Sequence, residues 1–237
     1  MKNYAIIVSG GQGRRMGTTQ KKQYLCLEKV PVLCRTILAF DQCNRIDQII
    51  LVIPKDDHQY CKENIIAPLN LSRMIHLVDG GKHRQDSVLN GLKKVEELIA
   101  SQADAMVLIH DGVRPFVDHT IINDCIDRAT DYGACIPGVK LTDTIKQANC
   151  DSYIEKTLDR DVLFSAQTPQ VFKFQLLLRA FAHARQTGFS GTDDASLVEH
   201  LGHPVYITKG SKLNIKITTQ DDMILASQIL RTANIIK

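Results

Sequence analysis

The sequence lacks the features of membrane, exported and nucleic-acid-binding proteins. No apolar run approaches the roughly 20 residues that a membrane-spanning helix needs, and the first residues show no signal-peptide pattern. A net charge of +3 on 237 residues is too small to indicate a nucleic-acid partner. There are no internal repeats or low-complexity segments. We therefore expect a cytoplasmic protein with one domain over residues 1–237.

Disulfide and zinc chemistry are also not indicated. The seven cysteines are odd in number, include no Cys-x-x-Cys pair and fall mostly in expected helices or strands. This usage is typical of reduced core residues in a cytosolic protein. His200 and His203 have only a weak metal-ligand spacing, and Gly202 and Pro204 favour a helix end there. His110 is expected to be a packed core imidazole.

The two common nucleotide-binding motifs are missing. A dinucleotide-binding Gly-x-Gly-x-x-Gly would need glycine at position 16, where Met16 stands, and an acidic residue about 20 positions later, which does not follow. A P-loop would need Lys-Ser/Thr after Gly17, where two threonines stand. A dinucleotide-dependent oxidoreductase is therefore disfavoured.

The sequence does contain a glycine-rich, cationic segment after its first apolar run. Residues 5–8 predict a buried strand, and Gly10, Gly11 and Gly13 open the loop after it. From Gly10 to Leu27 there is no acidic residue, and the cations are Arg14, Arg15, Lys21 and Lys22. Bare backbone N–H groups beside such cations favour a polyphosphate ligand. A turn with solvated cations is the alternative, which is less favoured because like charges in one turn repel.

Short apolar runs and helical patterns alternate along the rest of the chain. Strands are predicted at residues 48–54, 74–78, 105–109, 134–137 and 205–208, with an edge strand at 213–218. Helices are predicted at 31–43, 57–69, 87–99, 121–129, 174–185, 195–201 and 221–230. This order predicts an α/β fold with a mostly parallel twisted sheet and helices on both faces. Ligands of such sheets lie beyond the carboxyl ends of the strands.

Asp111 follows the strand predicted at 105–109, at that ligand-binding edge. A carboxylate there is suited to a magnesium ion bound to nucleotide phosphates. The alternative is that Asp111 caps the turn or the next helix, and the neighbouring cationic loop favours the metal. A cap is also the simple role for Thr192 or Asp193, just before the helix at 195–201.

Residues 138–160 change the pattern. Apolar and polar residues alternate on both sides of a turn at 149–151, which predicts a long β-hairpin. A two-stranded ribbon cannot bury itself. We therefore expect this arm either to cover the active site or to pair with a second subunit.

The motifs, taken in order, resemble one family. GGQGRRMG, KKQYL, GGKHRQDSVLNGL, HDGVRP, LTDTIK, LDRDVLFSAQTPQVF, GTDDASLVE and LNIKITT are similar to blocks of the 2-C-methyl-D-erythritol 4-phosphate cytidylyltransferases of the non-mevalonate isoprenoid pathway. The glycine-rich start alone is shared with sugar-nucleotide pyrophosphorylases, but the series covers nearly the whole chain. The family usually has proline where Lys21 stands and two alanines where Gly112 and Val113 stand, which affects the expected stiffness of these loops.

The resemblance implies a Rossmann-like nucleotidyltransferase fold with a protruding β-arm that serves a homodimer. It implies transfer of CMP from CTP to methylerythritol phosphate, with Mg²⁺ as cofactor and release of pyrophosphate. Such transfer needs mainly positioning and charge stabilisation, and no Ser-His or Cys-His pair stands out. No membrane or nucleic-acid partner is implied.

The resemblance also implies roles for single residues. Arg15 and Lys22 would stabilise the charge on the α-phosphate, and Arg160 and Lys216 would position the substrate phosphate. Arg160 would reach over from the neighbouring subunit's arm, and Asp111 would hold the metal. The residues implied for CTP are Ser9, Gly10, Gly11, Gly13, Gly81 and Ser87, and those for the second substrate are Thr144, Arg114 and Thr192.

Two other functions remain open from the sequence. Ribitol-5-phosphate cytidylyltransferase shares the glycine loop, QTPQ and NIKITT, although TLDRDVLFSAQTPQ and TDDASLVE favour the isoprenoid enzyme. A module that binds nucleotide without turnover is disfavoured because Arg15, Lys22, Arg160 and Lys216 are all retained.

Overall fold

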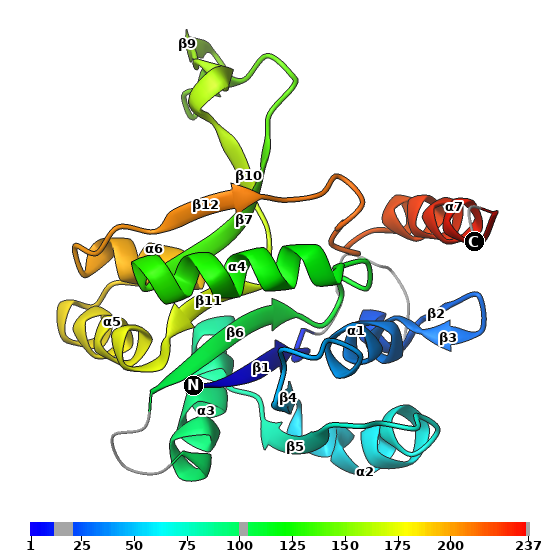
Figure 1. The fold of residues 1–237 in the computed structure, drawn as a ribbon. Coiled ribbons are helices and arrows are strands. Elements are labelled where there is room, and N and C mark those ends of the chain that lie inside the picture. Colours follow the sequence, from blue (N-terminus) through cyan, green and yellow to red (C-terminus); the bar gives the residue numbers. More distant parts are fainter. Residues whose placement is uncertain (12–20, 100–103, 236–237) are drawn as a thin grey trace.

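A mixed β-sheet of eight strands forms the centre of the molecule (Figure 1). The computed structural model describes residues 1–11, 21–99 and 104–235. The strands of the sheet are β1 (Lys2–Val8), β4 (Gln48–Ile53), β5 (Met74–Asp79), β6 (Ala105–Asp111), β7 (Ala134–Lys140), β10 (Phe164–Ala166), β11 (Gln170–Lys173) and β12 (Tyr206–Lys209). Two short ribbons lie apart from it, formed by β2 (Cys26–Leu27) with β3 (Val30–Pro31) and by β8 (Lys146–Ala148) with β9 (Ile154–Thr157).

Helices cover both faces of the sheet. They are α1 (Val32–Asp41), α2 (His58–Cys61), α3 (Arg84–Leu98), α4 (His119–Tyr132), α5 (Phe174–Thr187), α6 (Asp194–His200) and α7 (Gln220–Ile235). Short helical turns are η2 (Lys22–Tyr24), η3 (Lys55–Asp57), η4 (Lys62–Ile66) and η5 (Arg160–Val162). Within the described part of the chain, no helix has the length and apolar character that crossing a membrane requires.

The sheet has a parallel core and an antiparallel flank. The strand order is β10-β7-β11-β6-β1-β4-β5, and β12 pairs with β7. β1 lies parallel between β4 and β6, and β5 extends this parallel core. β10 and β11 run antiparallel to β7 because the chain returns from the β8–β9 hairpin without a crossover helix. The predicted α/β fold is confirmed, with more antiparallel pairing than the sequence indicated.

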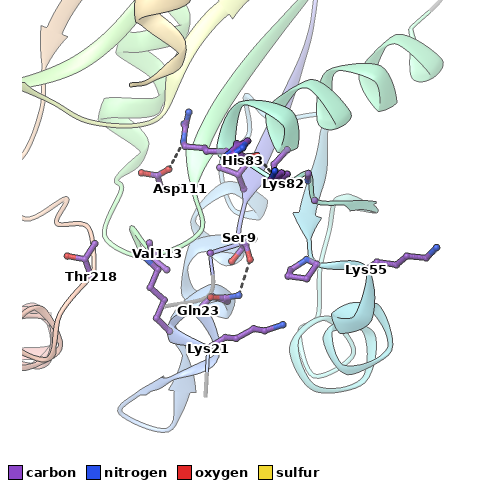
Figure 2. Close-up of a pocket in the computed structure, with 18 of the residues that line it drawn as sticks. Ser9, Lys21, Gln23, Lys55, Lys82, His83, Asp111, Val113 and Thr218 are labelled. Atoms are coloured by element: carbon purple, nitrogen blue, oxygen red, sulfur yellow. Dashed lines mark hydrogen bonds and ion pairs between the residues drawn. The ribbon is translucent and has the colours of Figure 1, made fainter. Parts of the chain in front are cut away.

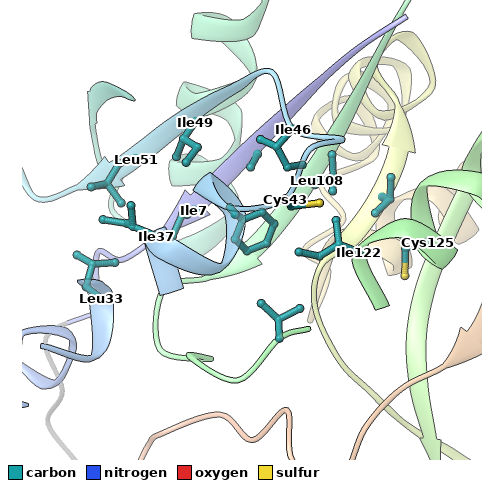
Figure 3. Packing of buried hydrophobic residues seen from close by; sticks show 14 of the residues in the cluster. Ile7, Leu33, Ile37, Cys43, Ile46, Ile49, Leu51, Leu108, Ile122 and Cys125 are labelled. Atoms are coloured by element: carbon teal, nitrogen blue, oxygen red, sulfur yellow. The ribbon is translucent and has the colours of Figure 1, made fainter. Parts of the chain in front are cut away.

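Two apolar layers sandwich the parallel core. Along β1, Ala5 and Ile7 join the cluster that contains side chains of α1 and α4, whereas Tyr4 and Ile6 join the cluster with α3, α5 and α6. Figure 3 shows Ile7 among the buried side chains of the first layer. Because both faces of the central strands are covered, their sequences are apolar without interruption. The buried core thereby fixes the strand ends that carry the functional loops.

The predicted strand at 213–218 is wrong. This segment has no ladder partner in the described structure and is held by other bonds. The Arg114 guanidinium donates to the Asn214 carbonyl at 2.7 Å, and the Ile217 amide donates to the Val113 carbonyl at 2.9 Å. The alternating apolar residues do not share one buried face: Leu213 is exposed, whereas Ile217 and the polar Asn214 are buried.

The helix predicted at 57–69 is shorter and less regular than expected. It forms as the four residues of α2, followed by the π-helical turn η4. Cys61 and Ile65 still face the core. The helix expected at 195–201 begins one residue earlier, at Asp194. Asp193 accepts a bond from the Ser196 amide at 3.0 Å and caps it, as one of the two sequence alternatives predicted.

The cysteine prediction holds for five of the seven residues. All seven are free, and those buried are Cys34, Cys43, Cys61, Cys125 and Cys135. Cys26 and Cys150 are exposed, in the β2–β3 ribbon and in the turn of the β8–β9 hairpin. Cys26 lies on the exposed side of its ribbon, next to the buried Leu27, and the β8–β9 hairpin has no core of its own.

Candidate active site

A cavity of about 1010 Å³ lies at the carboxyl ends of β1, β4, β5 and β6 (Figure 2). This is the edge at which ligands of parallel sheets bind. Six of its lining residues are basic, namely Lys21, Lys22, Lys55, Lys82, Arg84 and Lys216. Two are acidic, Asp56 and Asp111. The excess of positive charge suits a polyanionic ligand, as the glycine-rich segment predicted.

The glycine loop lines this cavity beyond β1. The Ser9 amide donates to the Val52 carbonyl at 2.8 Å, which ties the start of the loop to β4. A Cβ on Gly10 or Gly11 would meet other protein atoms only at 3.8 or 3.7 Å. Packing therefore tolerates larger residues there, and the bare backbone leaves room for a ligand. Gly13 and Arg15 lie outside the described residues.

The turn η2 holds Lys22 at the cavity. Gln23 is buried, and its side-chain amide donates to the Ser9 carbonyl at 3.0 Å (Figure 2). This bond links η2 directly to the end of β1, where the glycine loop starts. The neighbouring Lys22 lines the cavity, where the sequence predicted it. Gln23 itself was not expected, although it belongs to the KKQYL block.

Lys21 forms an ion pair beside the cavity. Its ammonium group lies 2.6 and 2.7 Å from the two carboxylate oxygens of Asp57, in η3. The Tyr24 hydroxyl donates to the same carboxylate at 3.0 Å, and burial together with Asp57 raises the pKa of Tyr24. Asp57 thus ties Lys21 and Tyr24 to η3.

The turn after β5 brings together Gly81 and Ser87, the two residues that the resemblance implies for the cytosine. The Gly81 amide donates to the Ser87 hydroxyl at 3.0 Å, and that hydroxyl donates to the His83 carbonyl at 3.1 Å. A Cβ on Gly81 would lie 2.2 Å from the Asp86 Cβ, so only glycine fits. The turn and the N-terminus of α3 both face the cavity.

Asp111 is the anionic centre of the site. It ends β6, and three cations surround its buried carboxylate: Arg84 Nε at 3.3 Å, Lys216 Nζ at 2.9 Å and Arg114 Nε at 3.6 Å. Burial alone would raise the pKa of Asp111. The charges of Arg84, Lys216 and Arg114 outweigh burial and hold that pKa well below its usual range, so the carboxylate is ionised.

The residues beside Asp111 are packed tightly. A Cβ on Gly112 would come within 2.8 Å of the Ser9 side chain, so glycine fits this position in the present packing. His110 is buried, and its ring nitrogens bond the Thr168 hydroxyl at 3.0 Å and the Arg114 carbonyl at 3.1 Å. Burial lowers the pKa of His110 to about 4. The prediction of a packed core imidazole is confirmed.

Two charged residues of the site were not predicted, Arg84 and Asp194. The Arg84 guanidinium lies between Asp111 and Asp194, with Nη2 2.8 Å from the Asp194 carboxylate. Both residues stand in blocks that carry the resemblance. The signals were a cation in the first turn of a helix, where the dipole disfavours it, and a second aspartate directly after the capping Asp193.

Other predicted site residues lie away from this cavity in a single chain. Arg160 is exposed in η5, and its guanidinium donates to the Thr142 carbonyl at 2.8 Å. Thr144 is exposed in the hairpin segment, and Thr192 is exposed before α6. Figure 1 shows the hairpin projecting away from the sheet. The roles of Arg160, Thr144 and Thr192 stay predictions.

The metal prediction concerns Asp111. In the described part of the chain, no group of three or more His, Cys, Asp or Glu residues is arranged to hold a metal ion. A metal at this site would therefore need ligands from the nucleotide as well as from Asp111.

Comparisons with known proteins agree on one family. A family model described as 2-C-methyl-D-erythritol 4-phosphate cytidylyltransferase matches residues 4–232. Proteins of that name from Syntrophus aciditrophicus and Clostridium novyi are 46% and 44% identical to the chain, each covering 97% of it and 96% of their own length.

Solved structures of this kind are similar as well. The 4-diphosphocytidyl-2C-methyl-D-erythritol synthase of Anaerococcus prevotii superimposes with a TM-score of 0.83 at 33% identity, covering 97% of this chain and 98% of its own. The 2-C-methyl-D-erythritol 4-phosphate cytidylyltransferase of Francisella tularensis gives 0.79 at 30% identity, covering 97% of this chain and 100% of its own.

Proposed function

The chain belongs to the 2-C-methyl-D-erythritol 4-phosphate cytidylyltransferase family and forms 4-diphosphocytidyl-2-C-methylerythritol from CTP and methylerythritol phosphate, and we propose that the cavity at the carboxyl ends of β1, β4, β5 and β6 is its active site. The observation that carries this proposal is the ionised Asp111 within a ring of cations at that edge. The family assignment removes the support for ribitol 5-phosphate as the second substrate.

We propose that the reaction is a displacement at phosphorus, with residues of this chain supplying charge and position. An oxygen of the substrate phosphate attacks the α-phosphorus of CTP, and the bond to the departing pyrophosphate breaks. Lys22 lies in the turn η2, and the next residue, Gln23, is bonded to the Ser9 carbonyl. This bond holds Lys22 at the cavity before CTP binds. Lys22, together with Arg15, stabilises the charge that develops on the α-phosphate.

Gly81 and Ser87 are proposed to read the cytosine. The backbone at Gly81 lies open to the cavity, and Ser87 is held by its bonds to Gly81 and His83. Lys216 and Arg114 are proposed to meet the substrate phosphate. Both already lie beside a carboxylate, Asp111, which fixes them where a phosphate can replace part of that contact.

Magnesium fits the site only together with the nucleotide. Mg²⁺ prefers six oxygen ligands and is often held by one or two carboxylates plus phosphates and water. Asp111 supplies one ionised carboxylate, but Arg84, Arg114 and Lys216 already balance its charge. We propose that the ion arrives with CTP and, when bound, adds positive charge to the phosphates.

We propose that the active protein is a homodimer in which the β8–β9 hairpin is the exchanged arm. The hairpin residues of β8 and β9 are exposed throughout and bury no core of their own. At its base a second cavity of about 650 Å³ is lined by apolar Phe164 and Ile207, both partly exposed. A second subunit at this base would cover them and bring Arg160 and Thr144 to a neighbouring active site. Thr192 would contact the substrate from its own subunit.

Location in the cytoplasm is also proposed. The seven cysteines are all free, and the two exposed ones, Cys26 and Cys150, need a reducing environment to remain so.

Pyrophosphate release tests the proposed function. The protein is mixed with CTP, magnesium and either methylerythritol phosphate or ribitol 5-phosphate. We expect release with methylerythritol phosphate and little with ribitol 5-phosphate. Release with both at similar kcat/KM would show that the cavity does not discriminate between the polyols, and release with neither would contradict the proposed site.

A further inference from the structure

Arg84 occupies a position that is electrostatically unfavourable for a cation. It is the first residue of α3, at the positive end of the helix dipole. Two carboxylates compensate this. Arg84 Nε donates to Asp111 Oδ1 at 3.3 Å, and Nη2 lies 2.8 Å from Asp194 Oδ2. The planar guanidinium therefore joins a residue at the end of β6 to one at the start of α6.

Asp194 is buried in a way that only a counter-ion explains. Its side chain is 1% exposed, and its neighbour Asp193 already caps α6. Burial raises the pKa of Asp194, whereas the charge of Arg84 acts in the opposite direction. Replacing a buried ion pair by apolar residues is often neutral or stabilising for a fold. Stability alone therefore does not account for the buried pair of Arg84 and Asp194, which points to a task at the site.

The position of Arg84 between Asp111 and Asp194 indicates what the pair does. Its helix begins at the turn that carries Gly81 and lines the cavity, and Asp194 follows the segment that carries Thr192. Without Asp194, the fork of Arg84 would be free to turn both of its edges to Asp111, and bidentate pairs of this kind are strong. Asp194 thus prevents the Asp111 carboxylate from being fully taken up by Arg84.

We propose that Arg84 and Asp194 are positioning residues of the cytidylyl transfer, which hold the Asp111 carboxylate at a fixed place between the nucleotide side and the second-substrate side of the cavity. The inference rests on the proposed role of Asp111. It adds two residues to the site that act through Asp111.

Asp194→Asn removes the charge and keeps the size of the side chain. We expect kcat to fall by about 10- to 100-fold, the usual cost of losing an outer partner of a functional carboxylate, while the Kd for CTP, measured by titration, changes by less than about threefold. Asp127→Asn is the matched control, because Asp127 forms a 2.9 Å pair with Arg45 away from the cavity. An Asp194→Asn enzyme with wild-type kcat would overturn the proposal.

Arg84 variants separate positioning from a structural role and decide the question even if Asp194→Asn does not fold. Arg84→Lys keeps the charge but loses the fork, so it should lose activity nearly as much as Arg84→Ala. Millimolar guanidinium should restore part of the rate of Arg84→Ala and should not change wild type or Arg45→Ala. If activity only follows the folded fraction in thermal unfolding and guanidinium restores nothing, the pair is structural and the proposal is wrong.

The same assays distinguish this inference from the proposed function. If Asp111→Asn has wild-type kinetics, the role proposed for Asp111 fails, whatever the Arg84 variants do. If Asp111→Asn is impaired but guanidinium does not rescue Arg84→Ala, the proposed site stands and the positioning role fails.

Discussion

The cavity and the β8–β9 hairpin hold their functional residues in opposite ways. Around Asp111, two of the three cationic side chains have a second anchor within the chain: Arg84 on Asp194, and Arg114 on the Asn214 carbonyl at 2.7 Å. In the hairpin, the residues of β8 and β9 are exposed, and Arg160 bonds the Thr142 carbonyl of its own arm. Contacts within one subunit can therefore position the side chains around Asp111, whereas the hairpin residues need a second surface to position them.

The largest effect is expected inside the cavity, at Lys22. Lys22→Ala should lower kcat by about 10²- to 10³-fold, because one pre-aimed donor to the developing charge is lost, while CTP binding weakens far less. Steady-state kinetics and a CTP titration measure both. Lys62→Ala, at an exposed position outside the cavity, is the control. Near-normal turnover of Lys22→Ala would mean that the cavity does not direct Lys22 at the α-phosphate.

The buried His110, next to Asp111, gives a prediction about the pH dependence of stability. Its folded pKa, about 4, is below the ordinary value of 6.5, so the unfolded state binds more protons between these values. The stability that neutral His110 contributes is complete above about pH 6.5 and is lost as the pH falls toward 4, by about 3 kcal/mol in total.

Urea unfolding at several pH values should show this loss in wild type and a flatter profile in His110→Gln. Parallel profiles for the two proteins between pH 7 and 4 would show that His110 is not the group responsible.

Asp111→Asn is expected to act at limiting magnesium. Asparagine keeps the shape of the side chain but removes the carboxylate that is proposed to hold the cation once it arrives with CTP. The magnesium concentration for half-maximal rate should rise by roughly tenfold, and excess magnesium should partly restore the rate. Asp56→Asn, at the rim of the same cavity, should change this concentration much less. An unchanged magnesium dependence would contradict the metal role and favour the alternative, in which Asp111 caps the turn.

The smallest expected effect is a partial recovery of activity in mixed dimers, which tests whether the hairpin completes the active site of a partner subunit. Arg160→Ala and Lys22→Ala should each be inactive. After joint unfolding and refolding, random pairing makes half of the dimers mixed, each with one intact site of two, so activity should return to about a quarter of wild type.

Lys146→Ala is the control in the same arm. Lys146 bonds Thr157 across the hairpin at 2.7 Å, and the variant should be active alone. If proven mixed dimers of Arg160→Ala and Lys22→Ala stay inactive, the arm serves its own subunit, and the contrast between the two regions disappears.

The sequence by itself determined the parallel core, the cationic cavity and the family. Apolar runs such as residues 48–53 are local signals of strands covered on both faces, and Gly81 and Ser87 are close in sequence, so their contact follows from one turn. The family resemblance could be found without a structure, because each motif is a continuous stretch of the sequence.

Only the tertiary structure decided how distant charges meet. Arg84 and Asp194 are 110 positions apart, and their pairing depends on α3 and α6 lying on the same face of the sheet. The alternation at 213–218 imitated a strand, but burial does not follow it: Leu213 is exposed, and the polar Asn214 is buried, where its amide donates to the Thr168 carbonyl at 2.9 Å. The local pattern shows which residues are apolar, and the folded chain alone decides which of them are buried and against what.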